Sequence, residues 1–165
     1  MSSFQSAGPQ SRPSPFSPSP RTLTALGWPH LLGALAGLTR TTLGRQGALS
    51  LPFLDDAAAI AASWTRLTEL RSLLRDQLRL PIGELDDLRP VFARAAKEAV
   101  LAATELLGCA SVIRTGSDLR RFLASQATRA PALSGQSRAL AALDGLAARI
   151  ESAIGANGEI KDEAS

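Results

Sequence analysis

The side chains best suited to binding chemistry are arginines in the second half of the chain. Arg114, Arg120 and Arg121 form the densest basic cluster, and Arg129 and Arg138 follow further along. Guanidinium groups bind phosphate oxygens through paired hydrogen bonds, so phosphate contact is one interpretation of the cluster. A solvated helix face explains the same spacing. It is favoured because the arginines are not interleaved with aromatic residues that would stack on bases. Arg114, Arg120 and Arg121 are therefore the candidate phosphate-contacting residues.

The sequence carries no motif for the common catalytic chemistries. Neither of the two lysines, Lys97 and Lys161, follows a glycine, so the phosphate-binding loop of nucleotide hydrolases is missing. The one histidine, His30, and the one cysteine, Cys109, are far apart in sequence. They are interpreted as a boundary residue and an inert core thiol, not as a metal site or a nucleophile pair. We expect no catalytic residue, cofactor or metal site in this chain.

The paired aspartates and two of the aromatic residues have structural interpretations that need no chemistry. Asp55-Asp56 and Asp86-Asp87 each precede an expected helix, where a carboxylate accepts hydrogen bonds from free backbone amides and favours the helix dipole. Trp64 and Phe92 fall on apolar helical positions, so both are predicted to be core residues.

Composition and proline content divide the chain into a tail and one helical domain. Leu and Ala dominate the apolar residues, Tyr is absent, and the net charge is a modest +3. This bias favours an all-α fold. Half of the ten prolines lie in residues 1–20, which predicts a disordered tail before a helical domain over residues 21–165. No apolar run has the length of a membrane span, so no membrane partner is expected.

Apolar periodicity predicts a series of helices in the domain. A helix after Pro29 is expected to bury Leu31, Leu35 and Leu38, and Thr41 or Thr42 is expected to cap the next. The clearest helix follows Asp56. It has an apolar stripe on one face and arginines on the opposite face, and Glu69 is expected to pair with these arginines. Its apolar stripe is Ile60, Trp64, Leu67, Leu70, Leu74 and Leu78, and the arginines are Arg66, Arg71, Arg75 and Arg79. A long helix is predicted over residues 102–126, and a linker is predicted at Pro131 and Gly135. A last helix is predicted over residues 137–156, followed by a short strand from Gly158.

Several short motifs occur in a fixed order along the domain. A T-L-x-x-L segment at residues 22–26 precedes Trp28, and T-x-x-G-R-x-x-A-L occupies residues 41–49. An L-x-D-[LIV]-R segment follows at 85–89, then V-L-x-x-x-E-L-L at 100–107. The series ends with I-x-x-A-I at 150–154 and G-x-[VI]-x-D-x-A-S at 158–165.

In order and spacing these motifs resemble the N-terminal region of bacterial MutS-two proteins, the MutS paralogues that end in a Smr nuclease domain. The resemblance implies an irregular helical bundle like the start of the MutS core, or lever, domain, truncated at its C-terminal end. It implies a non-catalytic fragment of a cytoplasmic, dimeric ATPase and endonuclease. Such proteins are linked to suppression of recombination, DNA repair and rescue of stalled ribosomes, so DNA or the ribosome is the implied partner. ATP and magnesium would belong to the full-length relative. The alternative is a stand-alone helical protein-interaction module without enzymatic activity.

The chain departs from the family pattern at two positions, both between the helix expected near Lys97 and the long helix from residue 102. The family often has glycine after the lysine matching Lys97, where this chain has Glu98, and a capping Ser or Thr after Leu101, where it has Ala102. These changes favour a more continuous helix there. At the other end, without the lever helix of a whole relative, part of the stripe Leu143, Leu146, Ile150 and Ile154 is expected to stay exposed.

Overall fold

The computed structural model describes residues 18–83, 85–155 and 157–161, and this part of the chain forms eight helices. The all-α class is therefore confirmed. The helices are α1 Pro20–Ala25, α2 Trp28–Gly37, α3 Thr42–Leu49, α4 Ala57–Arg75, α5 Arg89–Ala95, α6 Ala103–Ser125, α7 Pro131–Ser137 and α8 Asp144–Ala153. Residues 1–17 of the predicted tail lie outside the described residues, and α1 begins at Pro20 with Ser19 as its cap.

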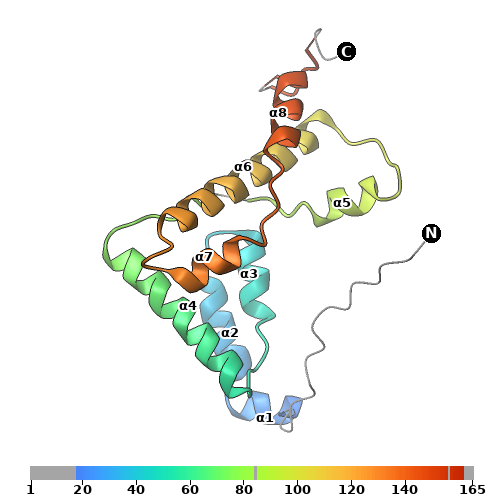
Figure 1. Ribbon diagram of the computed structural model, residues 1–165. Coiled ribbons are helices and arrows are strands. Elements are labelled where there is room, and N and C mark those ends of the chain that lie inside the picture. The colour runs from blue at the N-terminus through green and yellow to red at the C-terminus, as the bar shows by residue number, and fades with distance from the viewer. Residues whose placement is uncertain (1–17, 84, 156, 162–165) are drawn as a thin grey trace, which may run out of the picture.

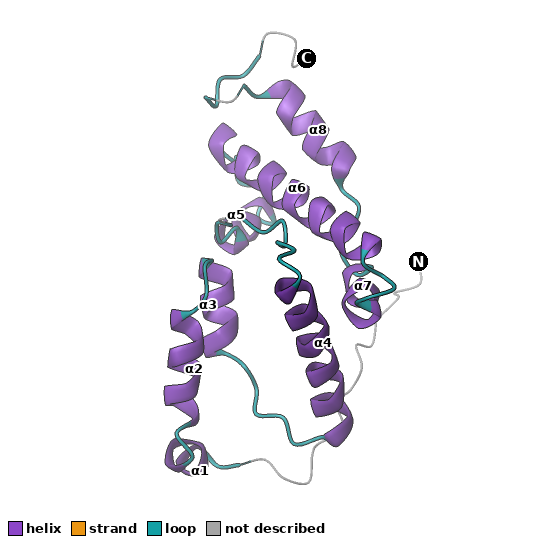
Figure 2. Ribbon diagram, turned by 90° about the vertical axis from the view of Figure 1, so that its left-hand side faces the viewer, coloured by secondary structure: helices purple, strands orange, loops and turns teal. Residues whose placement is uncertain are grey.

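The helices form two groups, which Figure 1 shows around the long diagonal α6. In the first group α8 packs on α6, α7 packs beside the C-terminal end of α6, and α4 packs on α7. In the second group α2 packs on α3, and α1 packs on α2. Figure 2 shows α2 and α3 side by side, with α4 standing apart from them. A side-chain hydrogen bond from Arg89 to Gln46 joins α3 to the start of α5.

A small apolar core holds α4, α6 and α7 together. Its buried members are Leu73, Leu123 and Ala130, with Leu78, Leu119, Phe122 and Leu133 packed around them. Trp64 and Phe92, predicted to be core residues, are instead 62% and 54% exposed. For Trp64 the prediction was wrong because α4 buries the side that carries Leu73 against α7, and periodicity alone does not say which side of a helix meets a neighbour. Phe92 lies on α5, which has no buried residue.

The side of α2 that is buried also differs from the prediction. Leu31, Leu35 and Leu38 are exposed, while Leu32 and Ala36 are buried. These two residues are four apart, so they lie on one face of α2, and α3 is the main neighbour of this helix. Leu and Ala occupy most positions of α2, so composition did not distinguish the buried side from the exposed one.

Predicted side-chain caps are present at the starts of α3 and α4. Thr41 Oγ1 accepts a hydrogen bond from the Gly44 amide at 2.9 Å, and Asp56 Oδ2 accepts one from the Ala59 amide at 2.7 Å. Asp87 Oδ1 accepts from the Arg89 amide at 3.1 Å, at the start of α5. The interpretation of the aspartates as capping residues is confirmed for Asp56, whereas the N-cap position of α5 is Leu88, one residue after Asp87.

The region predicted to be a linker at Pro131 and Gly135 is a helix, α7. Proline suits the first turn of a helix because the amides of that turn have no hydrogen-bond acceptor within the helix, so the missing N–H is not needed. Glu69, expected to pair with arginines, instead accepts hydrogen bonds from the Ala132 amide at 3.0 Å and the Leu133 amide at 2.9 Å. This carboxylate from α4 therefore caps α7 across a sequence distance that local patterns do not reveal.

The last helix is shorter than predicted. The prediction spanned residues 137–156, but residues 138–143 are not helical and α8 begins at Asp144. The non-helical stretch lets α7 and α8 pack on different parts of α6. Within the described residues the predicted strand near Gly158 is reduced to a single antiparallel bridge between Ile154 and Ile160.

The apolar stripe of α8 is partly exposed, as expected. Leu143 and Leu146 are exposed, while Ile154 is buried. Ala147 is fully buried where α8 packs on α6, and it lies on the same face as the stripe, four residues after Leu143 and three before Ile150. None of the described helices has the length and apolar character needed to cross a membrane.

A clear break separates α5 from α6, so the expectation of a continuous helix was wrong. Glu98 has a φ of 58°, in the left-handed region that glycine favours. Ala102 is the N-cap of α6 and has no side-chain oxygen to accept an amide hydrogen. The Ala102 amide donates to Glu105 Oε2 at 2.9 Å, and Glu105 also bonds to Arg94. The break is thus retained although the two residue types that usually favour it are absent.

Candidate phosphate-contacting surface

The three predicted arginines all lie on α6, but two of them face α8. Arg114 binds Glu151 through two hydrogen bonds, Nε to Oε1 at 3.1 Å and Nη2 to Oε2 at 2.6 Å. Asp144, at the start of α8, lies 3.9 Å from Arg114 and 3.6 Å from Arg120. Arg114 and Arg120 thus attach α8 to α6 by their charges.

Ion pairing partly neutralises this predicted site. The hydrogen bond from Arg114 lowers the pKa of Glu151, so the carboxylate is charged at neutral pH. Arg121 pairs with Asp118 one turn earlier on α6. A phosphate approaching Arg114 must compete with two carboxylates, which weakens its attraction to this residue. The structure therefore gives Arg114 a packing role.

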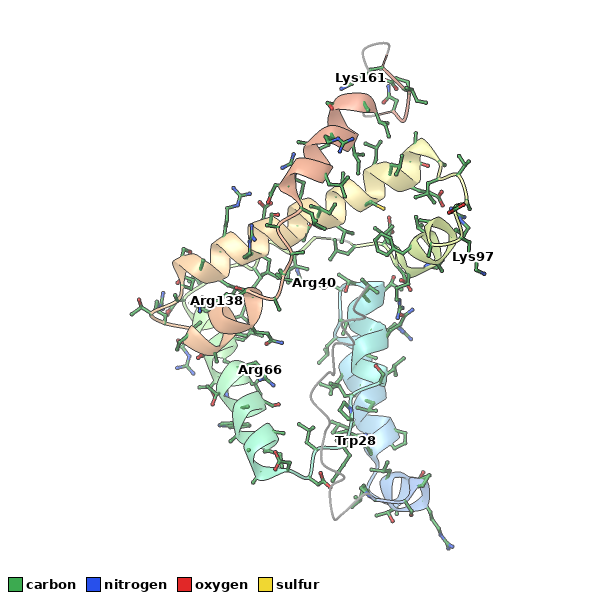
Figure 3. All side chains as sticks on the ribbon, turned by 45° about the vertical axis from the view of Figure 1, so that its right-hand side comes forward. Trp28, Arg40, Arg66, Lys97, Arg138 and Lys161 are labelled. Carbon is green, nitrogen blue, oxygen red and sulfur yellow. The ribbon has the colours of Figure 1, made fainter. Side chains whose placement is uncertain are left out.

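A cleft between α6 and α7 brings Arg120 and Arg121 together with a third arginine, Arg138. Its volume is about 340 Å³, and it is lined by Arg120, Arg121, Ala124, Ala127, Ser134, Ser137 and Arg138. Figure 3 shows Arg138 beside the C-terminal end of α6. Arg138 makes no ion pair with any residue in the described ranges. The cleft therefore holds one guanidinium without a carboxylate partner among the described residues, unlike Arg114.

Sequence patterns indicated Arg138 only as a distant member of the cluster. Its position depends on α7, because Arg138 is the C-cap of that helix. Ser137 Oγ donates to the Ser134 carbonyl oxygen at 2.8 Å, and both serines are buried where α7 meets its neighbours. A helical interpretation of residues 131–137, from the proline at their start, would have placed Arg138 near Arg120 and Arg121.

The other candidate chemical groups occupy separate places. Cys109 is buried on α6, and burial raises the pKa of its thiol. His30 is exposed on α2. Within the described ranges, no three His, Cys, Asp or Glu side chains gather in a way that could hold a metal ion. The interpretation of Cys109 as a core thiol is supported by its burial.

Fold and surface together define an all-α protein with a basic region around its longest helix. No family model matches the chain. Known proteins are similar to it over most of its length. Endonuclease MutS2 of Anaeromyxobacter sp. (strain Fw109-5) is 38% identical over 145 residues, and Endonuclease MutS2 of Symbiobacterium thermophilum is 34% identical over 145 residues. Endonuclease MutS2 of Pelotomaculum thermopropionicum is 31% identical over the same length.

The predicted resemblance to MutS2 proteins is confirmed by these relatives. Each alignment covers 88% of this chain and 18% of the relative. The chain thus spans about a fifth of the length of the curated relatives that it matches.

Proposed function

We propose that this chain is a non-catalytic helical part of a MutS2-like protein that handles nucleic acid, and that it contacts the phosphate backbone. The observation that carries the proposal is the similarity to MutS2 endonucleases over 88% of the chain. The cleft with Arg120, Arg121 and Arg138 supports it, because phosphate contacts supply most of the affinity of sequence-independent binding.

In this proposal the remaining chemistry belongs to other parts of a whole MutS2-like protein. ATP and magnesium binding, dimer formation and endonuclease cleavage would take place outside the helices described above. The cellular setting would be the cytoplasm, with DNA or the ribosome as the nucleic-acid partner, in suppression of recombination, DNA repair or rescue of stalled ribosomes.

A salt titration of nucleic-acid binding tests the proposal. The purified chain would be titrated into labelled single-stranded and duplex oligonucleotides, with fluorescence anisotropy as the readout. We expect saturable binding that weakens with salt, with a log–log slope of about −0.7 for each phosphate neutralised on a single strand. Arg138→Gln should reduce the affinity for whichever oligonucleotide uses the cleft. Absence of saturable binding at low salt would contradict the proposal.

A stand-alone protein-interaction module is the second candidate function. The exposed apolar residues of α2 and α4, such as Leu31, Ile60 and Leu67, favour it. Such a module has no need of phosphate contacts. It therefore predicts no saturable nucleic-acid binding in the same titration, and the two functions are separated by one experiment.

A further inference from the structure

A line of polar and aromatic side chains runs along the exposed side of α4. Trp64, Thr68, Arg71 and Arg75 are spaced by four, three and four residues, so they lie on one face of the helix. This face extends about 16 Å along the helix axis. Arg71 and Arg75 were assigned to the side opposite the apolar stripe, but this spacing places them beside Trp64. We call Trp64, Thr68, Arg71, Ser72 and Arg75 the α4 stripe.

The side chains of the α4 stripe are available for binding. Trp64 is 62% exposed, although burying the large apolar surface of a tryptophan is energetically favourable. A hollow of about 270 Å³ is lined by Thr68, Arg71, Ser72 and Arg75. In the described part of the chain neither Arg71 nor Arg75 makes an ion pair. The arginines predicted on α6, in contrast, are all paired with carboxylates.

The packing of α4 keeps this side open. The helix uses the side of Glu69 and Leu73 to contact α7, and α2 and α3 stand apart from α4 in Figure 2. Arg66 lies off the stripe and donates a hydrogen bond to Ser63 Oγ at 2.9 Å. The two unpaired guanidinium groups of the stripe are one helical turn apart, about 6 Å along the axis.

We propose that the α4 stripe binds a single-stranded nucleic acid, with a base stacked on the Trp64 indole and backbone phosphates bound by Arg71 and Arg75. The hydroxyl groups of Thr68 and Ser72 add hydrogen bonds to the phosphates. This inference deepens the proposed function and rests on it. An aromatic ring beside free positive charges is the combination that binds single strands with little sequence preference.

The chemistry favours a single strand over a duplex or a protein helix. The bases of a duplex are already stacked on each other, so the Trp64 ring would find no free base face. The exposed Ile60, Leu67 and Leu74 beside the stripe fit an apolar protein partner. Two unpaired guanidinium groups and two hydroxyls in one hollow fit phosphate better.

Fluorescence of Trp64 gives the first test. Trp28 is the other tryptophan, and it packs edge-on against Phe53 with ring centroids 5.3 Å apart. Trp28→Phe keeps an aromatic ring there and leaves Trp64 as the only fluorophore. Titration of this variant with unlabelled deoxyribose and ribose single strands should quench the fluorescence saturably. Duplex DNA should quench it less at equal concentration. The ratio between the two single strands distinguishes DNA from RNA as the source of the phosphates.

Matched substitutions give the second test, with anisotropy of labelled single strands as the readout. Trp64→Leu should weaken binding about tenfold to a hundredfold, and Trp64→Phe should weaken it less. The double variant Arg71→Gln and Arg75→Gln should reduce the magnitude of the log–log salt slope by about 1.4. Arg66→Gln, which removes the same charge from another side of α4, should change the affinity less than about twofold.

The outcomes separate this inference from the proposed function. If the unmodified chain binds single strands and the α4 variants bind equally well, the inference is overturned and the proposed function stands. If the unmodified chain binds no nucleic acid, both fail. Tighter binding to duplex than to single strands also overturns the inference. Binding of an acidic amphipathic peptide, but not of oligonucleotides, at Trp64 would assign the stripe to a protein partner instead. Trp64→Phe keeps the test valid if Trp64→Leu fails to fold.

Discussion

Replacing Glu98 by glycine is expected to stabilise this protein, although glycine usually weakens a chain. Glu98 has a φ of 58°, which costs a residue with a side chain roughly 1–2 kcal/mol. Glycine removes this cost but adds roughly 0.5–1 kcal/mol of backbone entropy lost on folding. The net gain in the free energy of unfolding is therefore about 0–1.5 kcal/mol, with the centre of the range at about 0.75 kcal/mol.

Urea unfolding of the full chain followed by circular dichroism measures this gain. Ala93→Gly is the matched control, because Ala93 lies in the interior of α5, where glycine should cost about 1 kcal/mol. Ala102→Ser should add a cap to α6 and stabilise by about 1 kcal/mol. If Glu98→Gly destabilises the protein as much as Ala93→Gly does, the break between α5 and α6 is not present and the reasoning is refuted.

Three further predictions concern stability and reactivity. Glu69→Ala should lower the free energy of unfolding by about 2 kcal/mol, because two amides of α7 lose their charged acceptor; unchanged stability in urea would contradict the capping role. Cys109 should react with a maleimide only as fast as the protein unfolds, since its thiol is buried and its pKa is raised; rapid labelling of the folded chain would argue against this. Asp87 and Glu151 have pKa values lowered by hydrogen bonds from Arg89 and Arg114, to about 2 for Asp87. The stabilisation that these two carboxylates contribute is complete above their pKa values in the unfolded chain. It is lost as the pH falls through their lower pKa values in the folded protein, so acid unfolding should begin below about pH 4.5. Glu151→Gln should flatten that pH dependence.

Local sequence signals predicted the helices whose ends are fixed by neighbouring residues. Thr41 and Asp56 cap their helices from three positions before the amide they bind, so a short window of sequence contains the whole interaction. The long helix α6 lies within one residue of its predicted bounds at each end. These elements depend on contacts between residues that are close in sequence.

Features that depend on distant residues were not predictable in this way. The helix α7 is capped by Glu69, more than sixty residues earlier, so Pro131 and Gly135 alone resembled a linker. The exposure of Trp64 follows from the packing of α4 on α7, which no periodicity specifies. The arginines of α6 formed a visible cluster, but their carboxylate partners on α8 became clear only in three dimensions. The unpaired arginines of α4 were overlooked for the same reason.

Photocrosslinking tests most directly whether this chain contacts nucleic acid through α4. A single-stranded oligonucleotide carrying a photoreactive base would be irradiated with the chain, and the modified tryptic peptide would be identified by mass spectrometry. Cleavage after Arg45 and Arg66 gives one peptide, residues 46–66, that contains Trp64. The account predicts that the base stacked on Trp64 forms its adduct in this peptide and that Trp64→Leu abolishes it. Adducts confined to peptides of α6, or no adduct at any salt concentration, would contradict it.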